Sequence, residues 1–253
     1  MNFQGRVAMI TGGGSGIGRA SALMLAREGA AIVICDINPE TGRSVAEEVR
    51  ALGREALSLP TDSSDRLQVQ ALVKAGTERF GKIDILVNNA GIAPQASLRD
   101  LTDELWDRII AVHLKSMFLC SQAVVEHMIP QGWGRIVNII SRAAYRGRAG
   151  IGPYTAAKGG MLAYSRVLAV ETAEWGITVN NVAPGTTRTP LLEQGYATEE
   201  AQVAEAVRSG VITQPIRLAE ADEMAAAVLY LCGPYSDHVS GTTLHVNGGS
   251  YMP

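Results

Sequence analysis

Thr11-Gly12-Gly13-Gly14-Ser15-Gly16-Ile17-Gly18 is the stretch that decides the fold; it follows an apolar run at residues 7–10 and precedes an expected helix over residues 16–28. Glycines permit a tight turn here, remove Cβ atoms where a pyrophosphate must approach, and let the helix pack closely on the sheet. Free N–H groups at the helix N-terminus attract the same anion. A nucleoside-triphosphate loop fits less well, because Arg19 and Ala20 follow where Lys and Ser or Thr are required. Taken alone, the motif also fits a tight strand-to-helix turn without a ligand.

Short apolar runs alternate with longer amphipathic stretches along the chain. The runs suit strands buried on both faces of a parallel sheet and lie at residues 7–10, 31–35, 56–59, 83–87, 135–140, 178–182 and 243–246. Helices are expected between them at residues 16–28, 39–52, 65–80, 102–129, 154–174 and 221–232. Asp65 and Thr102 stand where N-caps belong, and Pro39 suits a first helical position. Strict alternation predicts a doubly wound, Rossmann-type α/β fold whose ligands bind at the carboxyl ends of the strands.

The composition indicates one globular domain over residues 1–253. Hydrophobic residues make up 47% and charged residues 19%, and no linker or repeat separates two halves. A net charge of −3 lacks the basic footprint of a nucleic-acid-binding protein. Cys35, Cys120 and Cys232 are far apart, so they predict reduced, buried thiols. With no signal peptide and no apolar run of about 18 residues, we expect a cytoplasmic protein without a membrane partner.

Asp36 closes the second expected strand, 18 residues after Gly18. An acidic side chain near this offset hydrogen-bonds a ribose 2′-hydroxyl of NAD and repels the 2′-phosphate of NADP. A cation that compensates the 2′-phosphate charge could stand at position 15 or 37, but Ser15 and Ile37 are neutral. The sequence therefore favours NAD as the cofactor; the alternative is that Asp36 only caps the following turn.

Further motifs stand at the carboxyl ends of expected strands or at the starts of helices. They are Asp62-Ser63, Asn88-Asn89-Ala90-Gly91, Ser141 with Tyr154 and Lys158, and Pro184-Gly185-Thr186-Thr187-Arg188-Thr189-Pro190. Tyr154 and Lys158 form a YxxxK pair, and Ser141 precedes the tyrosine by 13 residues. With the TGxxxGxG spacing of the first turn, the set resembles the short-chain dehydrogenase/reductase family over about residues 5–249.

The resemblance implies a binding role for each motif. The glycine-rich turn holds the pyrophosphate, Asp62 and Ser63 lie at the adenine, and Asn89, Ala90 and Gly91 lie beside the adenosine ribose. The nicotinamide carboxamide is cradled by the segment containing Pro184, Gly185, Thr187 and Thr189. No metal ligand set is expected.

The resemblance also implies the chemistry, which interconverts a secondary alcohol (or a diol or polyol) and a ketone by hydride transfer. Tyr154 is the expected general acid/base, Ser141 holds the substrate oxygen, and Lys158 grips the nicotinamide ribose. Residues four apart share a helix face, so Lys158 stands beside Tyr154. A free tyrosine has a pKa of about 10. We expect the ammonium and the positive nicotinamide to lower it.

His113 departs from the family pattern, which has asparagine at this position, within Val112-His113-Leu114-Lys115-Ser116. In the family this residue joins a water relay to the lysine, largely through its backbone carbonyl, which histidine retains. His113 therefore either preserves the relay, adds a titrating group to it, or is a buried neutral imidazole without a kinetic role.

Two segments bear on the substrate. Arg142, Arg146 and Arg148 lie between Ser141 and Tyr154 and fit either an anionic substrate group or an exposed basic loop at a subunit contact. Residues 186–215 resemble the family's substrate lid. The family also pairs its long helices into homodimers or homotetramers.

The rival hypotheses are a 3-oxoacyl-type reductase, which usually prefers NADPH, a cis-diol or polyol dehydrogenase, and a non-catalytic NAD-binding regulator.

Overall fold

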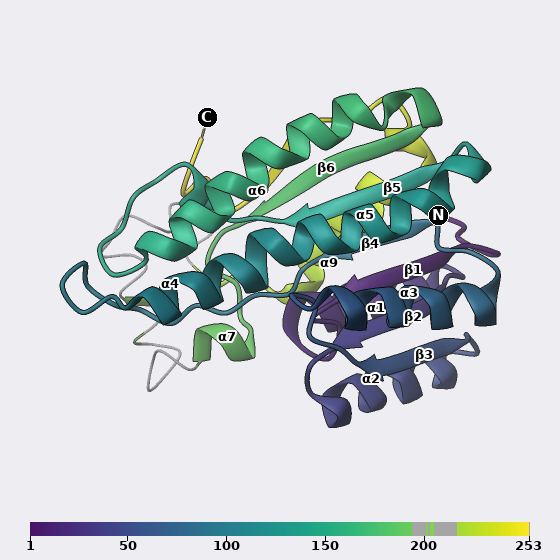
Figure 1. Ribbon diagram of the computed structural model, residues 1–253, viewed down its shortest axis with the longest axis horizontal. Helices are drawn as coiled ribbons and strands as arrows, with labels where there is room; N and C mark the ends of the chain where they lie inside the picture. Colours follow the sequence, from purple (N-terminus) through teal and green to yellow (C-terminus); the bar gives the residue numbers. More distant parts are fainter. Residues whose placement is uncertain (194–200, 202, 205–216, 253) are drawn as a thin grey trace.

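A computed structural model describes residues 1–193, 201, 203–204 and 217–252. Its centre is a seven-stranded parallel sheet of order β3-β2-β1-β4-β5-β6-β7 (Figure 1). The strands are β1 (Val7–Thr11), β2 (Ala31–Asp36), β3 (Ala56–Pro60), β4 (Ile85–Asn88), β5 (Gly134–Ile139), β6 (Ile177–Pro184) and β7 (Thr243–Val246). The chain runs outward from β1 to β3 and then returns to β4 beside β1, so the order reverses between β1 and β4. This confirms the doubly wound fold, in which ligands bind at the reversal point.

Helices cover both faces of the sheet (Figure 1). They are α1 (Gly16–Arg27), α2 (Pro39–Ala51), α3 (Arg66–Phe80), α4 (Asp103–Ile110), α5 (Ser116–Met128), α6 (Gly152–Glu171), the short α7 (Pro190–Glu193) and α9 (Ala221–Cys232). One core cluster joins α1, α2 and α9 to one face of the sheet, with Leu25, Val49 and Val228 fully or almost fully buried. The other joins α3, α5 and α6 to the opposite face, with Leu72 and Met117 fully buried. Because helices cover both faces of each strand, the side chains on both faces are apolar, and the apolar runs in the sequence are continuous.

The helix starts follow the caps expected from the sequence. The Asp65 carboxylate accepts hydrogen bonds from Leu67 N and Gln68 N, and the Thr102 hydroxyl accepts one from Leu105 N at 3.3 Å. Asn38 caps α2, whose first residue is Pro39. Helix α1 has no side-chain cap, so the N–H groups of its first turn are not occupied by the Ser15 hydroxyl.

The helix expected over residues 102–129 is interrupted by a π-helical turn, η1 (Ala111–Lys115), between α4 and α5. Here the Ser116 N–H bonds to Ala111 O, five residues back, which rotates the following helix relative to α4. Such turns are frequent at functional sites, and this one contains His113. Local propensity does not distinguish a π turn from an α turn, so the sequence predicts one uninterrupted helix.

The same helical stretch, Asp103–Gln131, is long and apolar enough by length and composition to cross a membrane. Lys115 breaks the apolar run, which is why the stretch does not stand out in the sequence. Half of its most apolar window is buried inside the protein, and a core helix of a globular domain passes the same test. The finding is weak evidence for a membrane span.

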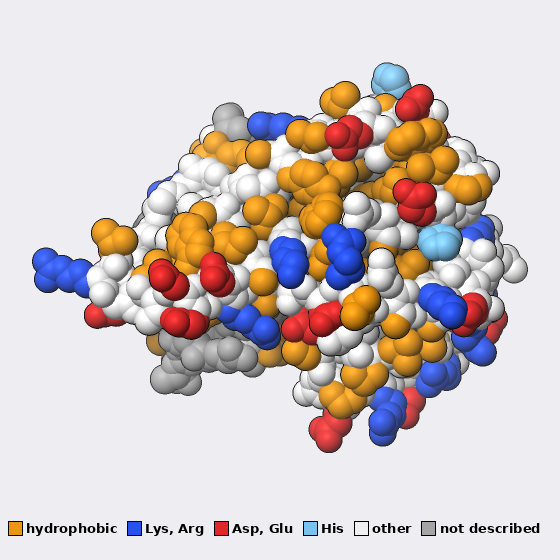
Figure 2. Space-filling model, viewed as in Figure 1, with side chains coloured by type: hydrophobic (Ala, Val, Ile, Leu, Met, Phe, Trp, Pro, Cys, Tyr) orange, Lys and Arg blue, Asp and Glu red, His pale blue; other side chains and the backbone are white. Residues whose placement is uncertain are grey.

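Exposed apolar side chains lie on the outer surface of α4 and α6 (Figure 2). Val170 is 80% exposed, Val167 49% and Trp106 41%. Most of the expected lid, residues 186–215, lies outside the described residues. Its first stem is described: Thr187 pairs with Ala219 in an isolated parallel bridge, and Arg188 N donates to Ala219 O at 2.8 Å.

Candidate active site

The glycine-rich turn packs tightly at the N-terminus of α1. Gly12 and Gly16 adopt left-handed φ values of 61° and 49°, which side chains disfavour. A Cβ on Gly18 would lie 2.1 Å from Gly12 O, so this position tolerates only glycine. A Cβ on Gly16 would lie 3.1 Å from the Thr189 methyl group, which brings the expected nicotinamide segment next to the phosphate turn. The N–H groups of the first turn of α1, which no side chain caps, together with this glycine-rich turn fit a dinucleotide pyrophosphate.

Asn89 secures this turn from the neighbouring strand. Its amide donates to Thr11 O and Gly12 O, both at 3.0 Å. The Thr11 hydroxyl accepts from Asn89 N at 2.9 Å and from Ala90 N at 3.0 Å. The segment Asn89-Ala90-Gly91 thus lies against the glycine turn, at the point where the strand order reverses.

The Asp36 carboxylate is held at the same edge of the sheet. Its Oδ2 accepts the Gly14 N–H at 2.8 Å, and its Oδ1 accepts the Asn38 N–H at 2.9 Å. Next to it, Ile37 is 62% exposed and carries no charge. The carboxylate therefore caps the turn that follows β2 and is also held against the glycine-rich turn, so both interpretations of Asp36 remain open.

Asp62 and Ser63 follow β3, as expected from the sequence. Ser63 is buried, and Asp62 accepts hydrogen bonds from the backbone and the hydroxyl of Ser64 at 2.9 and 2.6 Å. Burial opposes ionisation of Asp62, but the Ser64 bonds and the nearby charges of Arg108 and Lys115 hold its pKa below the ordinary value.

Ser141, Tyr154 and Lys158 come together at the carboxyl end of β5. Tyr154 and Lys158 lie in the first two turns of α6, and the Lys158 Nζ lies 5.7 Å from the centre of the Tyr154 ring. Lys158 is buried and donates to Ile139 O at 2.7 Å. The Ser141 oxygen accepts the Ala143 N–H at 3.1 Å and is hydrogen-bonded to Tyr154.

The electrostatics of this group depend mainly on burial. Burial raises the pKa of Tyr154, and the hydrogen bond from Ser141 and the charge of Arg142 oppose that rise without overcoming it. Burial also lowers the pKa of Lys158 to about 7. The protein by itself therefore does not lower the tyrosine pKa, because desolvation dominates both groups, and a lowering by the ammonium together with a bound nicotinamide stays a prediction.

His113 lies beside this group with its ring edge-on to Tyr154, the two ring centres being 5.2 Å apart. It is 1% exposed, and its Nε2 lies 2.8 Å from Ile92 O and 3.1 Å from Ile92 N. Its Nδ1 is buried and has no hydrogen-bond partner among the described residues. Burial, with the nearby Lys158 charge, lowers its pKa to about 3, against a smaller opposing effect of the Ile92 hydrogen bond. The imidazole is therefore neutral at physiological pH.

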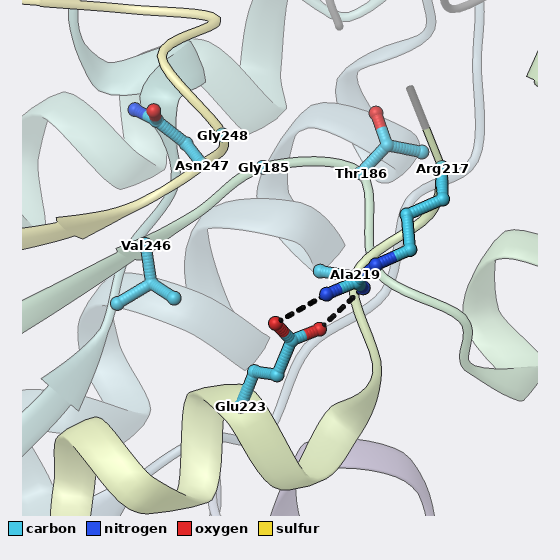
Figure 3. Close-up of a pocket in the computed structure, with 8 residues that line it drawn as sticks. All are labelled: Gly185, Thr186, Arg217, Ala219, Glu223, Val246, Asn247 and Gly248. Atoms are coloured by element: carbon cyan, nitrogen blue, oxygen red, sulfur yellow. Dashed lines mark hydrogen bonds and ion pairs between the residues drawn. The ribbon is translucent and has the colours of Figure 1, made fainter. Parts of the chain in front are cut away.

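The expected nicotinamide segment begins at the end of β6. Gly185 N donates to Val246 O at 2.9 Å, and a Cβ on Gly185 would lie 2.8 Å from Asn247 Cα. A small cavity of about 130 Å³ opens beside Gly185 and Thr186 (Figure 3). Arg217 and Glu223 line this cavity, and the Arg217 guanidinium donates two hydrogen bonds of 2.7 and 2.8 Å to the Glu223 carboxylate. These two charges neutralise each other, and Ser141, Tyr154 and Lys158 do not line the cavity.

Two features of the site were not anticipated from the sequence. One is a buried amide chain across three strands, in which Asn88 Nδ2 donates to Asn138 Oδ1 at 2.9 Å and Asn138 Nδ2 donates to Asn181 Oδ1 at 3.2 Å. The strand register pairs these residues directly, and the available signal was an asparagine inside each of three neighbouring apolar strands. The other is the electrostatic interaction of Arg142 with Tyr154.

Among the described residues, no group of three His, Cys, Asp or Glu side chains could hold a metal ion.

Comparison with known proteins places this geometry in one family. The short chain dehydrogenase family model matches residues 6–200. The chain is 42% identical to the (2S)-[(R)-hydroxy(phenyl)methyl]succinyl-CoA dehydrogenase subunit BbsD of Thauera aromatica, covering 98% of each chain. It is 37% identical over the full length of both chains to the 3-oxoacyl-[acyl-carrier-protein] reductase FabG of Escherichia coli (strain K12). The crystal structure of levodione reductase superposes with a TM-score of 0.89 at 36% identity, covering 98% of each chain. The chain therefore belongs to the short-chain dehydrogenase/reductase family and is an oxidoreductase acting on hydroxyl or keto groups.

Proposed function

We propose that this protein is an NAD(H)-dependent oxidoreductase that interconverts a secondary alcohol and a ketone. One observation carries the proposal: Ser141, Tyr154 and Lys158 converge at the strand ends, on the same edge of the sheet as the glycine turn and Asp36. A bound nicotinamide would accept or supply the hydride at this place.

The protein's own residues handle the proton and the orientation of the substrate. The Ser141 oxygen accepts the Ala143 N–H, and the Ser141 O–H, which is hydrogen-bonded to Tyr154 in this structure, would turn to donate to a substrate carbonyl or alkoxide. Tyr154 exchanges the proton at that oxygen through its phenol group. Lys158 is anchored at Ile139 O by one donor and has two further N–H groups for a ribose hydroxyl and a water molecule.

Asp36 supports NAD as the cofactor over NADP. Both of its oxygens accept backbone N–H groups, so the carboxylate cannot swing away from a 2′-phosphate without losing two hydrogen bonds. Full-length similarity to FabG is the one observation that favours a second candidate, a 3-oxoacyl-type reductase. The intact Ser141, Tyr154 and Lys158 geometry disfavours a non-catalytic NAD-binding regulator.

The domain and assembly follow the same reasoning. Residues 1–253 form one catalytic domain with a substrate lid at 186–215. The exposed apolar residues on α4 and α6 support a homodimer or homotetramer, because a monomer gains nothing from exposing such side chains together (Figure 2). The three buried, free cysteines suit a reducing compartment such as the cytoplasm.

Turnover assays test the function directly. The purified protein is incubated with NAD⁺ and a panel of secondary alcohols, diols and polyols, and with NADH and the matching ketones and 3-oxoacyl thioesters. We expect NADH formation or consumption that depends on Tyr154. Preferential turnover of 3-oxoacyl thioesters with NADPH would support the second candidate. Tight NADH binding without turnover of any member of the panel would favour the regulator.

A further inference from the structure

The loop between Ser141 and Tyr154 carries three positive charges close together. Residues 142–150, called here the arginine loop, contain Arg142, Arg146 and Arg148, and the chain has no Asp or Glu between Glu126 and Glu171. Arg146 and Arg148 are exposed, whereas Arg142 is partly buried. In a chain of net charge −3, this loop is a local concentration of positive charge.

Contacts at several points hold the arginine loop in place. The Tyr145 ring stacks on Tyr251 with ring centres 4.8 Å apart, and its hydroxyl donates to the Thr243 hydroxyl at 3.1 Å. Arg146 Nη1 donates to Ser250 O at 2.8 Å. At the far end of the loop, Gly150 O accepts the Ala96 N–H at 3.0 Å. The backbone of the loop is therefore held between the C-terminal segment and the loop that follows β4, and Arg146 is anchored at the C-terminal segment.

One of these charges, Arg142, lies beside the reacting groups. Arg142 directly follows Ser141, and its guanidinium interacts electrostatically with the Tyr154 phenol. Burial, and after it the charges of Arg146 and Arg148, lower the pKa of Arg142, so the three guanidinium groups lie within electrostatic range of one another. Like charges held together in this way repel one another, and an anion bound among them would relieve that repulsion.

We propose that Arg142, Arg146 and Arg148 form a subsite for an anionic group of the substrate, and that this group is a carboxylate near the reacting carbon. The proposal rests on the oxidoreductase function proposed above. Arg142 adjoins the residue that holds the substrate oxygen, so the anion lies a few bonds from the carbonyl, as in a keto acid. The planar guanidinium fork matches the two oxygens of a carboxylate, and Arg146 keeps donors beyond its bond to Ser250 O. A phosphate ester offers similar oxygens farther from the reacting carbon and is treated as a separate arm of the test.

A binding experiment tests the subsite without requiring turnover. The protein–NADH complex is titrated with butanoate and with its neutral isostere butanamide, and binding is followed by NADH fluorescence. We expect butanoate to bind at least fivefold more tightly, and this preference to fall to less than twofold in the Arg146→Gln/Arg148→Gln double variant. Arg166→Gln is the control, because Arg166 is exposed on α6, about 18 Å along the helix axis from Tyr154 at 1.5 Å per residue. Equal binding of the acid and the amide, or a preference that the double variant retains, would overturn the proposal.

A turnover experiment then separates this proposal from the proposed function. Acetoacetate is compared with methyl acetoacetate, and dihydroxyacetone phosphate with dihydroxyacetone, each with NADH. We expect kcat/KM for acetoacetate to exceed that for its ester at least tenfold, and added salt to reduce the difference. Turnover of the ester at the same or a higher kcat/KM would reject the anion subsite and leave the oxidoreductase function standing. A preference confined to the phosphate pair would reject the carboxylate assignment. Preferential butanoate binding in a protein that turns over none of these four ketones and no member of the panel described above would support the subsite and reject the proposed function.

Discussion

His113→Asn separates the three roles that the sequence leaves open for this residue. The imidazole is 1% exposed and bonds through Nε2 to the Ile92 peptide, and burial lowers its pKa from 6.5 to about 3. An asparagine amide has both a donor and an acceptor for Ile92 O and N, and it leaves the backbone carbonyl of residue 113 in place. We therefore expect the Asn variant to keep turnover within a few-fold of the parent and to show an unchanged pH–rate profile.

The same pKa shift predicts a measurable effect on stability. Below pH 6.5 the unfolded chain binds a proton at His113 that the folded protein does not bind until about pH 3. A group whose folded pKa is lowered contributes stability at high pH that is lost as the pH falls, at 1.36 kcal/mol per pH unit, so His113 should destabilise the protein by about 2.7 kcal/mol between pH 6.5 and 4.5. The Asn variant cannot bind this proton, so its loss of unfolding free energy between pH 7.5 and 4.5 should be smaller by about that amount.

Urea unfolding at pH 7.5 and 4.5 measures this difference at a fixed protein concentration. His127→Asn is the matched control, because His127 lies on α5 and is exposed. Equal acid destabilisation of the parent and His113→Asn would refute the buried, neutral imidazole. Loss of an ionisation from the pH–rate profile in His113→Asn, with folding and NADH affinity unchanged, would show that the imidazole titrates during turnover.

Four further predictions follow from the site and the core. We expect the parent protein to prefer NADH over NADPH at least about tenfold in kcat/KM, or ~1.4 kcal/mol, and Asp36→Ala to reduce this preference. Equal use of both cofactors by the parent would reject the NAD assignment. Tyr154→Phe should lower kcat at least ~100-fold while NADH still binds by fluorescence titration, and near-normal turnover would mean that the proton comes from elsewhere. Because burial lowers the pKa of Lys158 to about 7, kcat/KM for ketone reduction should fall above that pH as the ammonium loses its proton. Lys158→Arg should abolish this fall. A decline that persists in the Arg variant would assign the ionisation to another group. Asp84 is fully buried, and its carboxylate accepts hydrogen bonds from Arg6 Nη1 at 2.7 Å, Lys82 Nζ at 3.1 Å and Val7 N at 2.8 Å. Asp84→Asn should therefore lower the free energy of unfolding in urea by about 3 kcal/mol with little change in kcat. Unchanged stability would show that this network contributes nothing.

Most of the fold could be predicted because it depends on local patterns. The apolar runs mark strands covered on both faces, and Asp65 and Thr102 cap the helices that the sequence assigns to them. The π turn around His113 could not be predicted, because it depends on packing between the helix and the loop that follows β4. The helix expected at residues 154–174 begins at Gly152 and ends at Glu171, so its ends differ from the prediction by two and three residues. Helix ends depend on one or two terminal hydrogen bonds, which the sequence pattern does not determine.

The site could be predicted by position but not by its electrostatics. Spacing alone indicates that Tyr154 and Lys158 share a helix face, and the structure confirms their proximity. Burial, which the sequence does not quantify, raises the pKa of Tyr154 and lowers that of Lys158. A reference pKa combined with a neighbouring charge therefore does not give the direction of the tyrosine shift in the protein by itself. Desolvation of both groups has the larger effect.

The place of His113 in this site depends on Gly91. A Cβ on Gly91 would lie 2.5 Å from His113 Cε1, so the imidazole occupies the volume that a side chain at position 91 would need. This contact brings Nε2 to the Ile92 peptide and turns the ring edge toward Tyr154. The imidazole therefore fits beside the Ile92 peptide because residue 91 is glycine, and the same close packing buries the ring and lowers its pKa. We therefore expect histidine at this position to support the loop after β4, and we expect Tyr154, Lys158 and water to be the groups that exchange protons with the substrate.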